Sequence, residues 1–206
     1  MSFRNIPALH PIYIDYAYRR GFFPMPHPDT GEVLWFDPDP RAIIPLDGFH
    51  VSKSLKKSLR TRGYTVSFDT AFQQVVLSCA QRSETWINQD FKSMYQEMYK
   101  LGVAHSVEVW LDDKLVGGVF GLKFGGVFNG ESMFSTATDA SKVALYSLVK
   151  AMRIAKMTVL EVQFMTPHLK SLGAVGVSRA EYHKLIEQNV NLEVSLLPEH
   201  FRGPLF

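Results

Sequence analysis

Residues 106–134 read SVEVWLDDKLVGGVFGLKFGGVFNGESMF and carry the clearest structural pattern in the chain. Apolar and polar residues alternate over Ser106–Leu111, as is typical of a half-buried strand. The Asp pair at 112–113 reads as a turn, and glycine-interrupted strands are predicted over 114–122 and 126–134. The stretch therefore predicts three consecutive antiparallel strands.

The sequence after this meander alternates between helix and strand patterns. Asp139 or Ser141 is expected to cap a helix that runs to about Met157, and residues 158–164 read as a further strand. Ser178 begins a last helix, because Glu181 completes a capping-box pattern with it. Antiparallel strands followed by a helix and another strand predict an α+β domain with a mixed sheet.

The region before the meander, from Arg41 to about residue 101, shows the same two patterns. The predicted elements are a strand over 41–46, a helix over 53–60 capped by Ser52, a strand over 64–68, a helix over 70–82 capped by Asp69, and a helix over 87–101 that stops at Gly102. This region is assigned with the meander to one larger domain, residues 41–206.

Residues 1–40 differ in composition and are predicted to form a small N-terminal domain. A short helix is expected over 13–20, ended by Gly21, and a strand over 32–36 after a turn at 29–31. Prolines are dense here and are expected to prevent regular structure nearby, at Pro24, Pro26, Pro28, Pro38 and Pro40.

Composition limits the classes of protein that the chain can belong to. Its 206 residues are 46% apolar and 20% charged, which is enough for a core in one domain with a small appendage. No apolar run reaches membrane-spanning length, and Met1–Asn5 lacks a signal-peptide pattern. The only cysteine, Cys79, excludes an intrachain disulfide and a four-cysteine zinc site, and its apolar helical surroundings predict a buried small hydrophobe. These features predict a cytoplasmic location.

Basic residues concentrate in one short segment although the net charge is only +2. They are Lys53, Lys56, Lys57, Arg60 and Arg62, and no acidic residue occurs from Val51 to Phe68. On a helix, residues 53, 56, 57 and 60 share one face, which is suited to contacting RNA phosphates. A solvated helix face is the alternative interpretation.

Eight short segments of the chain resemble the leucyl/phenylalanyl-tRNA–protein transferase family. In collinear order they are Tyr18–Pro24, Trp35–Ala42, Thr85–Ile87, Ala104–Trp110, Leu115–Gly118, Gly130–Ser135, Ala140–Lys142 and Ser171–Ala174. The resemblance extends from about Tyr13 to Leu185 and implies a small N-terminal domain followed by an acyltransferase domain of the N-acetyltransferase (GNAT) type. The segment before Tyr13 is shorter than the family usually carries, so a reduced N-terminal domain is expected.

The resemblance also implies an activity. A family member moves leucine or phenylalanine, with methionine as a further candidate, from aminoacyl-tRNA to a protein N-terminus. The usual acceptor begins with Arg or Lys and is thereby marked for degradation. Because the aminoacyl ester is already activated, the reaction needs no metal or organic cofactor. The expected partners are aminoacyl-tRNA and the acceptor protein, with no membrane, and a monomer is the default expectation.

Glu161 and Gln163 are the candidate catalytic residues. They lie at i and i+2 of the strand predicted over 158–164, so both side chains are expected on one side of it. The matching family pair, Asp and Gln, is proposed to orient the incoming amine and to relay its proton. Glu161 keeps the carboxylate but adds a methylene, and the polar face of an ordinary strand is the alternative.

The substrate-binding candidates come from the same resemblance. Glu131 matches the acceptor site, Trp86 matches the site for the terminal adenosine, and Met25 stands where the family has a second Trp. The apolar amino-acid pocket is matched by Val119, Phe128, Leu145 and Leu148, with Leu148 in place of a Phe. From the residues alone, a salt bridge for Glu131, a core-rim position for Trp86 and plain core for the pocket residues are the alternatives.

Two other function classes stay open on the sequence. An acyl-CoA acetyltransferase should carry a Q/R-x-x-G-x-G/A turn that holds pyrophosphate, and the segment Ser171–Gly176 does not fit it. A tRNA-binding protein without transferase activity is kept open by Met25 and Glu161. His105 and His168 have no nucleophile partner in the sequence and are interpreted as hydrogen-bonding residues.

Overall fold

The computed structural model describes residues 9–82, 85–196 and 202–204, so Met1–Asn5 lies outside the described residues. The helices are α1 (Pro11–Tyr18), α2 (Lys53–Thr61), α3 (Phe72–Ala80), α4 (Gln89–Lys100), α5 (Ala140–Ile154), α6 (Pro167–Ser171) and α7 (Arg179–Asn189). The strands are β1 (Phe23–Pro26), β2 (Val33–Phe36), β3 (Arg41–Ile44), β4 (Thr65–Phe68), β5 (Ala104–Leu111), β6 (Lys114–Phe124), β7 (Val127–Ser135), β8 (Val159–Glu161), β9 (Val175–Val177) and β10 (Arg202–Pro204). No helix of the described part is long and apolar enough to cross a membrane.

The main sheet confirms the predicted meander and the α+β class. Within the described residues its order is β10-β4-β5-β6-β7-β8-β3-β9. The pair β7–β8 is parallel and the other neighbours are antiparallel, so the sheet is mixed. Asp112 and Asp113 have φ angles of 49° and 58°, the left-handed conformation that tight hairpin turns require.

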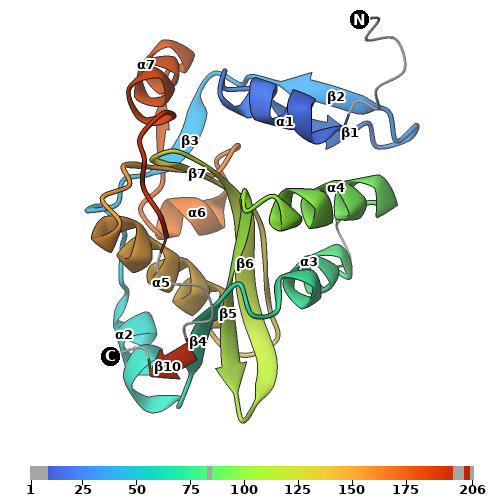
Figure 1. Cartoon of the computed structure of the whole chain (residues 1–206). Coiled ribbons are helices and arrows are strands. Elements are labelled where there is room, and N and C mark those ends of the chain that lie inside the picture. Colours follow the sequence, from blue (N-terminus) through green and yellow to red (C-terminus); the bar gives the residue numbers. More distant parts are fainter. Residues whose placement is uncertain (1–8, 83–84, 197–201, 205–206) are drawn as a thin grey trace, which may run out of the picture.

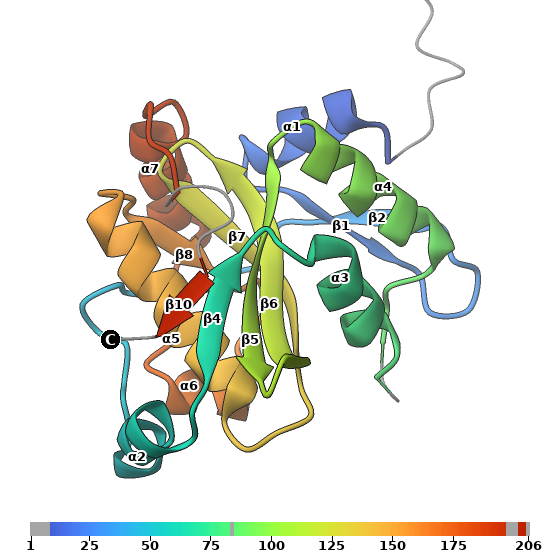
Figure 2. The ribbon, with the colours of Figure 1, turned by 60° about the horizontal axis from the view of Figure 1, so that its bottom comes forward.

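Helices cover both faces of this sheet. Figures 1 and 2 show α3 and α4 on one side of β5 and β6, and α5 on the other. Each side has its own buried cluster: α5 packs with residues such as Val109 and Val119, and α3 and α4 pack with residues such as Phe120. Helix α1 and the two-stranded sheet β1–β2 lie across one end of the molecule (Figure 1).

The predicted helix caps are only partly confirmed. Ser52 and Ser178 cap α2 and α7 as expected, and Ser178 forms the full capping box with Glu181. Asp69 does not cap α3. Its carboxylate instead accepts a 2.7 Å bond from the Ser106 N–H and contacts His105 Nδ1 at 2.7 Å.

Asp139 stands at the N-cap position of α5 but makes no cap hydrogen bond there. Its φ of 63° turns the side chain away from the helix end. The carboxylate accepts hydrogen bonds from Ser58 Oγ at 2.8 Å and Lys142 Nζ at 2.9 Å.

The expectation that prolines prevent regular structure near residue 24 is wrong. Strand β1 pairs antiparallel with β2, with Pro24 opposite Trp35 and Pro26 opposite Val33. The two prolines are two positions apart, so their missing N–H groups lie on the same edge of β1. Proline is tolerated in an edge strand when that edge does not pair.

The strand predicted over 158–164 is shorter than expected. Strand β8 ends at Glu161, because Gln163 has a φ of 55°, in the left-handed region. The chain bends there and continues into α6 and β9, which the sequence patterns did not predict.

Candidate active site

A cleft of about 850 Å³ lies between the small sheet and the main sheet. Its walls come from β1, the end of α3 and the segment after it, the end of β7, the first turns of α5, and the bend after β8. Six of the predicted site residues line it: Met25, Trp86, Val119, Glu131, Leu145 and Gln163. The fold thus gathers residues that are up to 138 positions apart, from 25 to 163 (163 − 25 = 138).

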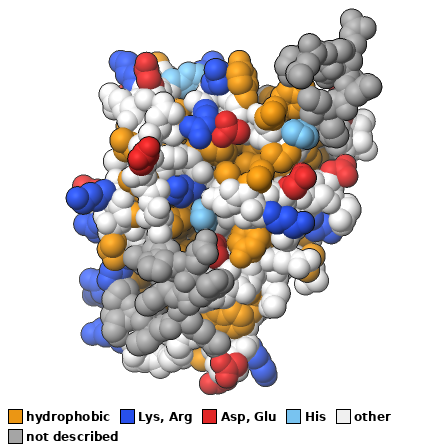
Figure 3. Space-filling model, viewed as in Figure 1, with side chains coloured by type: hydrophobic (Ala, Val, Ile, Leu, Met, Phe, Trp, Pro, Cys, Tyr) orange, Lys and Arg blue, Asp and Glu red, His pale blue; other side chains and the backbone are white. Residues whose placement is uncertain are grey.

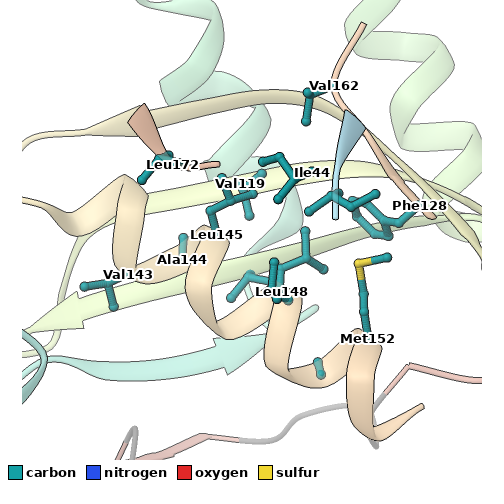
Figure 4. Packing of buried hydrophobic residues seen from close by; sticks show 14 of the residues in the cluster. Ile44, Val119, Phe128, Val143, Ala144, Leu145, Leu148, Met152, Val162 and Leu172 are labelled. Carbon is teal, nitrogen blue, oxygen red and sulfur yellow. The ribbon is translucent and has the colours of Figure 1, made fainter. Parts of the chain in front are cut away.

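Three of the predicted catalytic and substrate-binding residues do not line the cleft. Phe128 and Leu148 are 1% and 0% exposed and belong to the core around α5. Figure 4 shows Leu145 beside Val119, whereas Leu148 lies one turn further along α5, on the side of Phe128 and Met152. Glu161, also 0% exposed, lies behind the cleft wall.

Glu131 is held by two tyrosines that the sequence interpretation missed. The Tyr18 hydroxyl donates to Oε1 at 2.8 Å, and the Tyr95 hydroxyl donates to Oε2 at 2.8 Å. Burial raises the pKa of Glu131 to about 8 against the two hydroxyl bonds that lower it, and the neighbouring Glu161 charge raises it further. Burial likewise raises the pKa of both tyrosines well above the usual range.

The two tyrosines gave only weak signals in the sequence. Tyr18 ends the short helix before Arg19-Arg20-Gly21, and Tyr95 lies on the apolar side of the helix pattern. Each could be read as core, because nothing local indicates that a carboxylate 113 or 36 residues away will meet it.

Glu161 is buried with a charged partner. Its Oε1 atom lies 3.0 Å from Arg41 Nη1 and accepts a 2.7 Å hydrogen bond from the backbone N–H of Gln163. Burial raises the pKa of Glu161, and the Arg41 charge opposes that rise. The Glu161 carboxylate therefore contacts the backbone of Gln163.

The Gln163 side chain enters the cleft with an unused donor. Its Nε2 atom is buried and has no hydrogen-bond partner in the described part of the chain. Buried amide donors are normally satisfied, so this atom is suited to bind an oxygen of a molecule in the cleft. Because Gln163 lies in the bend after β8, it does not share a strand face with Glu161, contrary to the expectation from their spacing.

Trp86 and Met25 both contribute apolar surface to the cleft wall. Trp86 is half-buried and meets Phe91 and Tyr95 edge-on, with ring centroids 5.3 and 6.3 Å away. Met25 is also half-buried and packs against the same cluster. Both side chains keep exposed surface toward the cleft.

A cation and a histidine border the cleft. Arg82 is exposed and donates to the Met133 carbonyl at 3.2 Å. His168 also lines the cleft, and burial together with the Lys142 charge lowers its pKa. Arg82 thus places positive charge at the edge of a cleft with both polar and apolar walls, and the lowered pKa of His168 favours its neutral form.

The basic helix α2 lies next to this opening. Its four predicted cations are all exposed, as is Arg62 directly after the helix; the four are Lys53, Lys56, Lys57 and Arg60. On the buried side, Ser58 bonds to Asp139, and Tyr64 just after the helix donates to the Thr138 carbonyl at 2.8 Å. Residues 136 and 141, on either side of that contact, line the cleft.

Figure 3 shows Lys and Arg side chains along the lower left edge of the molecule, where Figure 1 places α2. A positive surface beside a mixed polar and apolar cleft is suited to a polyanion with an uncharged end group.

Comparisons with known proteins agree over nearly the whole chain. The family described as "Leucyl/phenylalanyl-tRNA protein transferase" matches residues 43–187, and its N-terminal domain matches residues 8–39. The leucyl/phenylalanyl-tRNA–protein transferase of Herpetosiphon aurantiacus is 48% identical over 86% of this chain and 93% of that protein. Those of Cereibacter sphaeroides and a Ruegeria species are 46% and 49% identical, over 95% and 84% of this chain and 92% and 83% of theirs.

Among solved structures, the chain resembles L-PGS from Bacillus licheniformis at a TM-score of 0.43 and 16% identity. The match covers 63% of this chain and 47% of that one.

Proposed function

The chain belongs to the leucyl/phenylalanyl-tRNA–protein transferase family, and on that basis we propose that it moves leucine or phenylalanine from aminoacyl-tRNA to the N-terminal amine of a protein. The observation that carries the proposal is the joint placement of Trp86, Glu131 and Gln163 in one cleft beside the basic helix α2.

The reaction exchanges an ester for an amide. The neutral α-amine attacks the ester carbonyl carbon, and the bond from that carbon to the ribose oxygen breaks. One amine proton ends on the ribose hydroxyl, so the step needs no oxidant or reductant. The protein has to hold the two substrates together, keep the amine neutral and stabilise the developing oxyanion.

The described residues divide these tasks. Gln163 offers its unused Nε2 donor to the ester carbonyl oxygen, and Glu161 positions Gln163 through the bond to its backbone N–H. Trp86 and Met25 hold the terminal adenosine, and the amino-acid side chain lies against Val119 and Leu145. Phe128 and Leu148 shape that pocket from behind.

The direct test is transfer of labelled leucine from leucyl-tRNA to a peptide with N-terminal Arg. The same peptide with an acetylated N-terminus is the control, because it offers no amine. Labelled product with the free peptide alone is expected. Absence of transfer, with tRNA binding retained, would identify a tRNA-binding protein without the activity.

Glu131 is proposed to bind the cationic acceptor end, which predicts a pH-dependent loss in Glu131→Gln. Below the pKa of about 8 Glu131 is largely neutral, and above it the carboxylate attracts the N-terminal Arg side chain. The ratio of wild-type to variant kcat/KM should therefore rise with pH through about 8. An increase of about tenfold matches one charge-assisted hydrogen bond.

Titration of the acceptor amine cancels in that ratio, because both proteins use the same peptide. A ratio that stays flat from pH 6.5 to 9 on the same peptide would contradict this role of Glu131. Rates should be measured at saturating charged tRNA.

Met25→Trp is expected to strengthen binding of charged tRNA. A second indole in the cleft wall offers another stacking surface for the terminal adenine, which is worth about 1–3 kcal/mol per stacked base. The KM for charged tRNA should fall about fivefold, whereas Met25→Leu, which adds no ring, should leave it unchanged. A KM for Met25→Trp that equals that of Met25→Leu would place the adenine elsewhere.

We propose a GNAT-like fold for residues 41–206 and a separate small domain for 1–40. The antiparallel run β4–β7, followed by α5 and the parallel strand β8, supports the first assignment. The second is supported by β1 and β2, which form a sheet of their own. Because charged tRNA is made in the cytoplasm, the protein is proposed to act there.

A further inference from the structure

Arg41, the first residue of β3, is buried with its charge. Its side chain is 2% exposed, and Nη1 contacts Glu161 Oε1 at 3.0 Å. The other terminal nitrogen, Nη2, contacts Asp37 Oδ1 at 3.2 Å and donates to the Gly21 carbonyl. Removing a cation from water costs several kcal/mol unless it is closely paired, so such a residue has a specific task in the fold.

The contacts of Arg41 come from parts of the chain that are far apart. Gly21 follows α1, Asp37 follows β2, and Glu161 ends β8. The guanidinium carbon also lies 4.9 Å from the Phe23 ring centroid and 4.4 Å from that of Tyr182 on α7. Arg41 therefore joins β1, which forms one cleft wall, to the end of β8, where Gln163 follows.

The Glu161 carboxylate transmits this contact to Gln163. Its Oε1 atom receives both the Arg41 bond and the Gln163 backbone N–H. Gln163 has a left-handed φ of 55°, which is uncommon for a residue other than glycine and needs surrounding contacts to hold it. An ionised Glu161 makes the stronger hydrogen bond to that backbone.

We infer that Arg41 is a positioning residue for aminoacyl transfer: it holds the Glu161 carboxylate in place and thereby fixes the bend that aims Gln163 into the cleft. The inference rests on the proposed function of the site. Arg41 does not line the cleft, so its effect on the reaction passes through Glu161.

Lysine cannot replace Arg41 in this arrangement. The planar guanidinium directs Nη1 to Glu161 and Nη2 to Asp37 and Gly21 at the same time. A lysine ammonium is a single point charge, so it can neutralise Glu161 without holding the other two partners.

The test compares kcat, KM and the pH profile of kcat for Arg41→Gln, Arg41→Lys and wild type. Arg41→Gln should lower kcat about 100-fold, with both KM values within about threefold, because positioning of a catalytic group is lost rather than substrate binding. Arg41→Lys should lower kcat about tenfold. Arg179→Gln is the matched control: Arg179 contacts Asp37 at 3.3 Å and does not touch Glu161, so its kcat should stay within about twofold.

The pH profile separates positioning from general stability. Within the described part of the chain, the charged or titratable groups that interact with Glu161 are Arg41, Glu131, Tyr18 and Tyr182. Loss of the Arg41 cation should move the acidic limb of the kcat profile to higher pH. Arg41→Lys keeps a cation and should leave that limb in place. If Arg41→Gln does not fold, the tenfold lower kcat of Arg41→Lys with an unchanged acidic limb is the result that tests the inference.

Wild-type kcat in Arg41→Gln, or equal losses in Arg41→Gln and Arg179→Gln, would overturn the inference. An unshifted acidic limb in a folded Arg41→Gln, judged by normal tRNA affinity, would overturn it as well. If wild type itself transfers no leucine, the proposed function fails instead, so the two failures are distinguishable.

Discussion

Gln163→Ala is expected to lower kcat about 100-fold while the affinity for charged tRNA stays within about twofold. The buried Nε2 atom has no partner among the described residues, so its bond should form only with substrate or transition state. Losing an interaction made mainly in the transition state lowers kcat without weakening binding. Single-turnover transfer of leucine and a separate tRNA-binding assay measure the two quantities.

Gln81→Ala is the matched control for this experiment. Gln81 also lines the cleft and undergoes the same substitution, but it comes from the end of α3 and is exposed. Its kcat should equal that of wild type. Wild-type turnover in Gln163→Ala, or an equal loss in Gln81→Ala, would remove Gln163 from the reaction.

Glu161 has to be tested with a substitution that preserves its packing. Glu161→Ala would leave the Arg41 cation buried without this partner, and breaking a buried pair costs about 3–5 kcal/mol of stability. Glu161→Gln keeps the volume and removes the charge. It is expected to lower kcat with tRNA affinity near normal, as for Gln163→Ala.

The triple substitution Lys53→Ala, Lys56→Ala and Lys57→Ala is expected to weaken tRNA binding about tenfold or more and to flatten its salt dependence. Each lysine–phosphate contact contributes about 0.7–0.9 to the slope of log K against log salt concentration. Three lost contacts should therefore reduce the magnitude of the slope by about 2–3. Filter binding or fluorescence titration over a salt series measures it.

Three exposed lysines elsewhere make a matched control with the same change in net charge: Lys100, Lys114 and Lys184, on α4, β6 and α7. Their joint replacement by Ala should leave the slope unchanged if tRNA lies along α2. The proposal of α2 as the tRNA site fails if the two triple variants show the same slope.

Local patterns predicted those parts of the fold whose stabilising contacts are local. Alternation over 106–134 gave the meander, and side-chain caps at Ser52 and Ser178 gave the starts of α2 and α7. The exposed position of the basic residues on α2 also followed from the sequence, because a helix with this spacing buries only its opposite side.

The parts that could not be predicted depend on contacts between distant segments. Pairing with β2 makes a strand of the proline-containing β1, and its unpaired edge is visible only in the structure. The Arg41–Glu161 pair spans 120 residues. Arg41 did carry one signal, since a charged residue begins a strand that is otherwise apolar, but its partner could not be read from the sequence.

Family resemblance grouped residues that local patterns could not group, but it did not predict which of them are exposed to the cleft and which are buried behind it. It placed Trp86, Glu131 and Gln163 in one site, and all three line the cleft. It also grouped Leu148 with Leu145, although only Leu145 reaches the cleft. One turn of α5 separates these two side chains, and that turn decides which one meets a substrate.

The attachment of α2 fixes the distance between the basic helix and the cleft. The bonds from Ser58 to Asp139 and from Tyr64 to Thr138 tie the basic helix to the rim of the cleft. A tRNA whose stem rests on α2 can then deliver its ester to the cleft only if its single-stranded end has the matching length. If tRNA binds along α2 as proposed, the length of its single-stranded end would therefore decide whether the ester reaches the cleft.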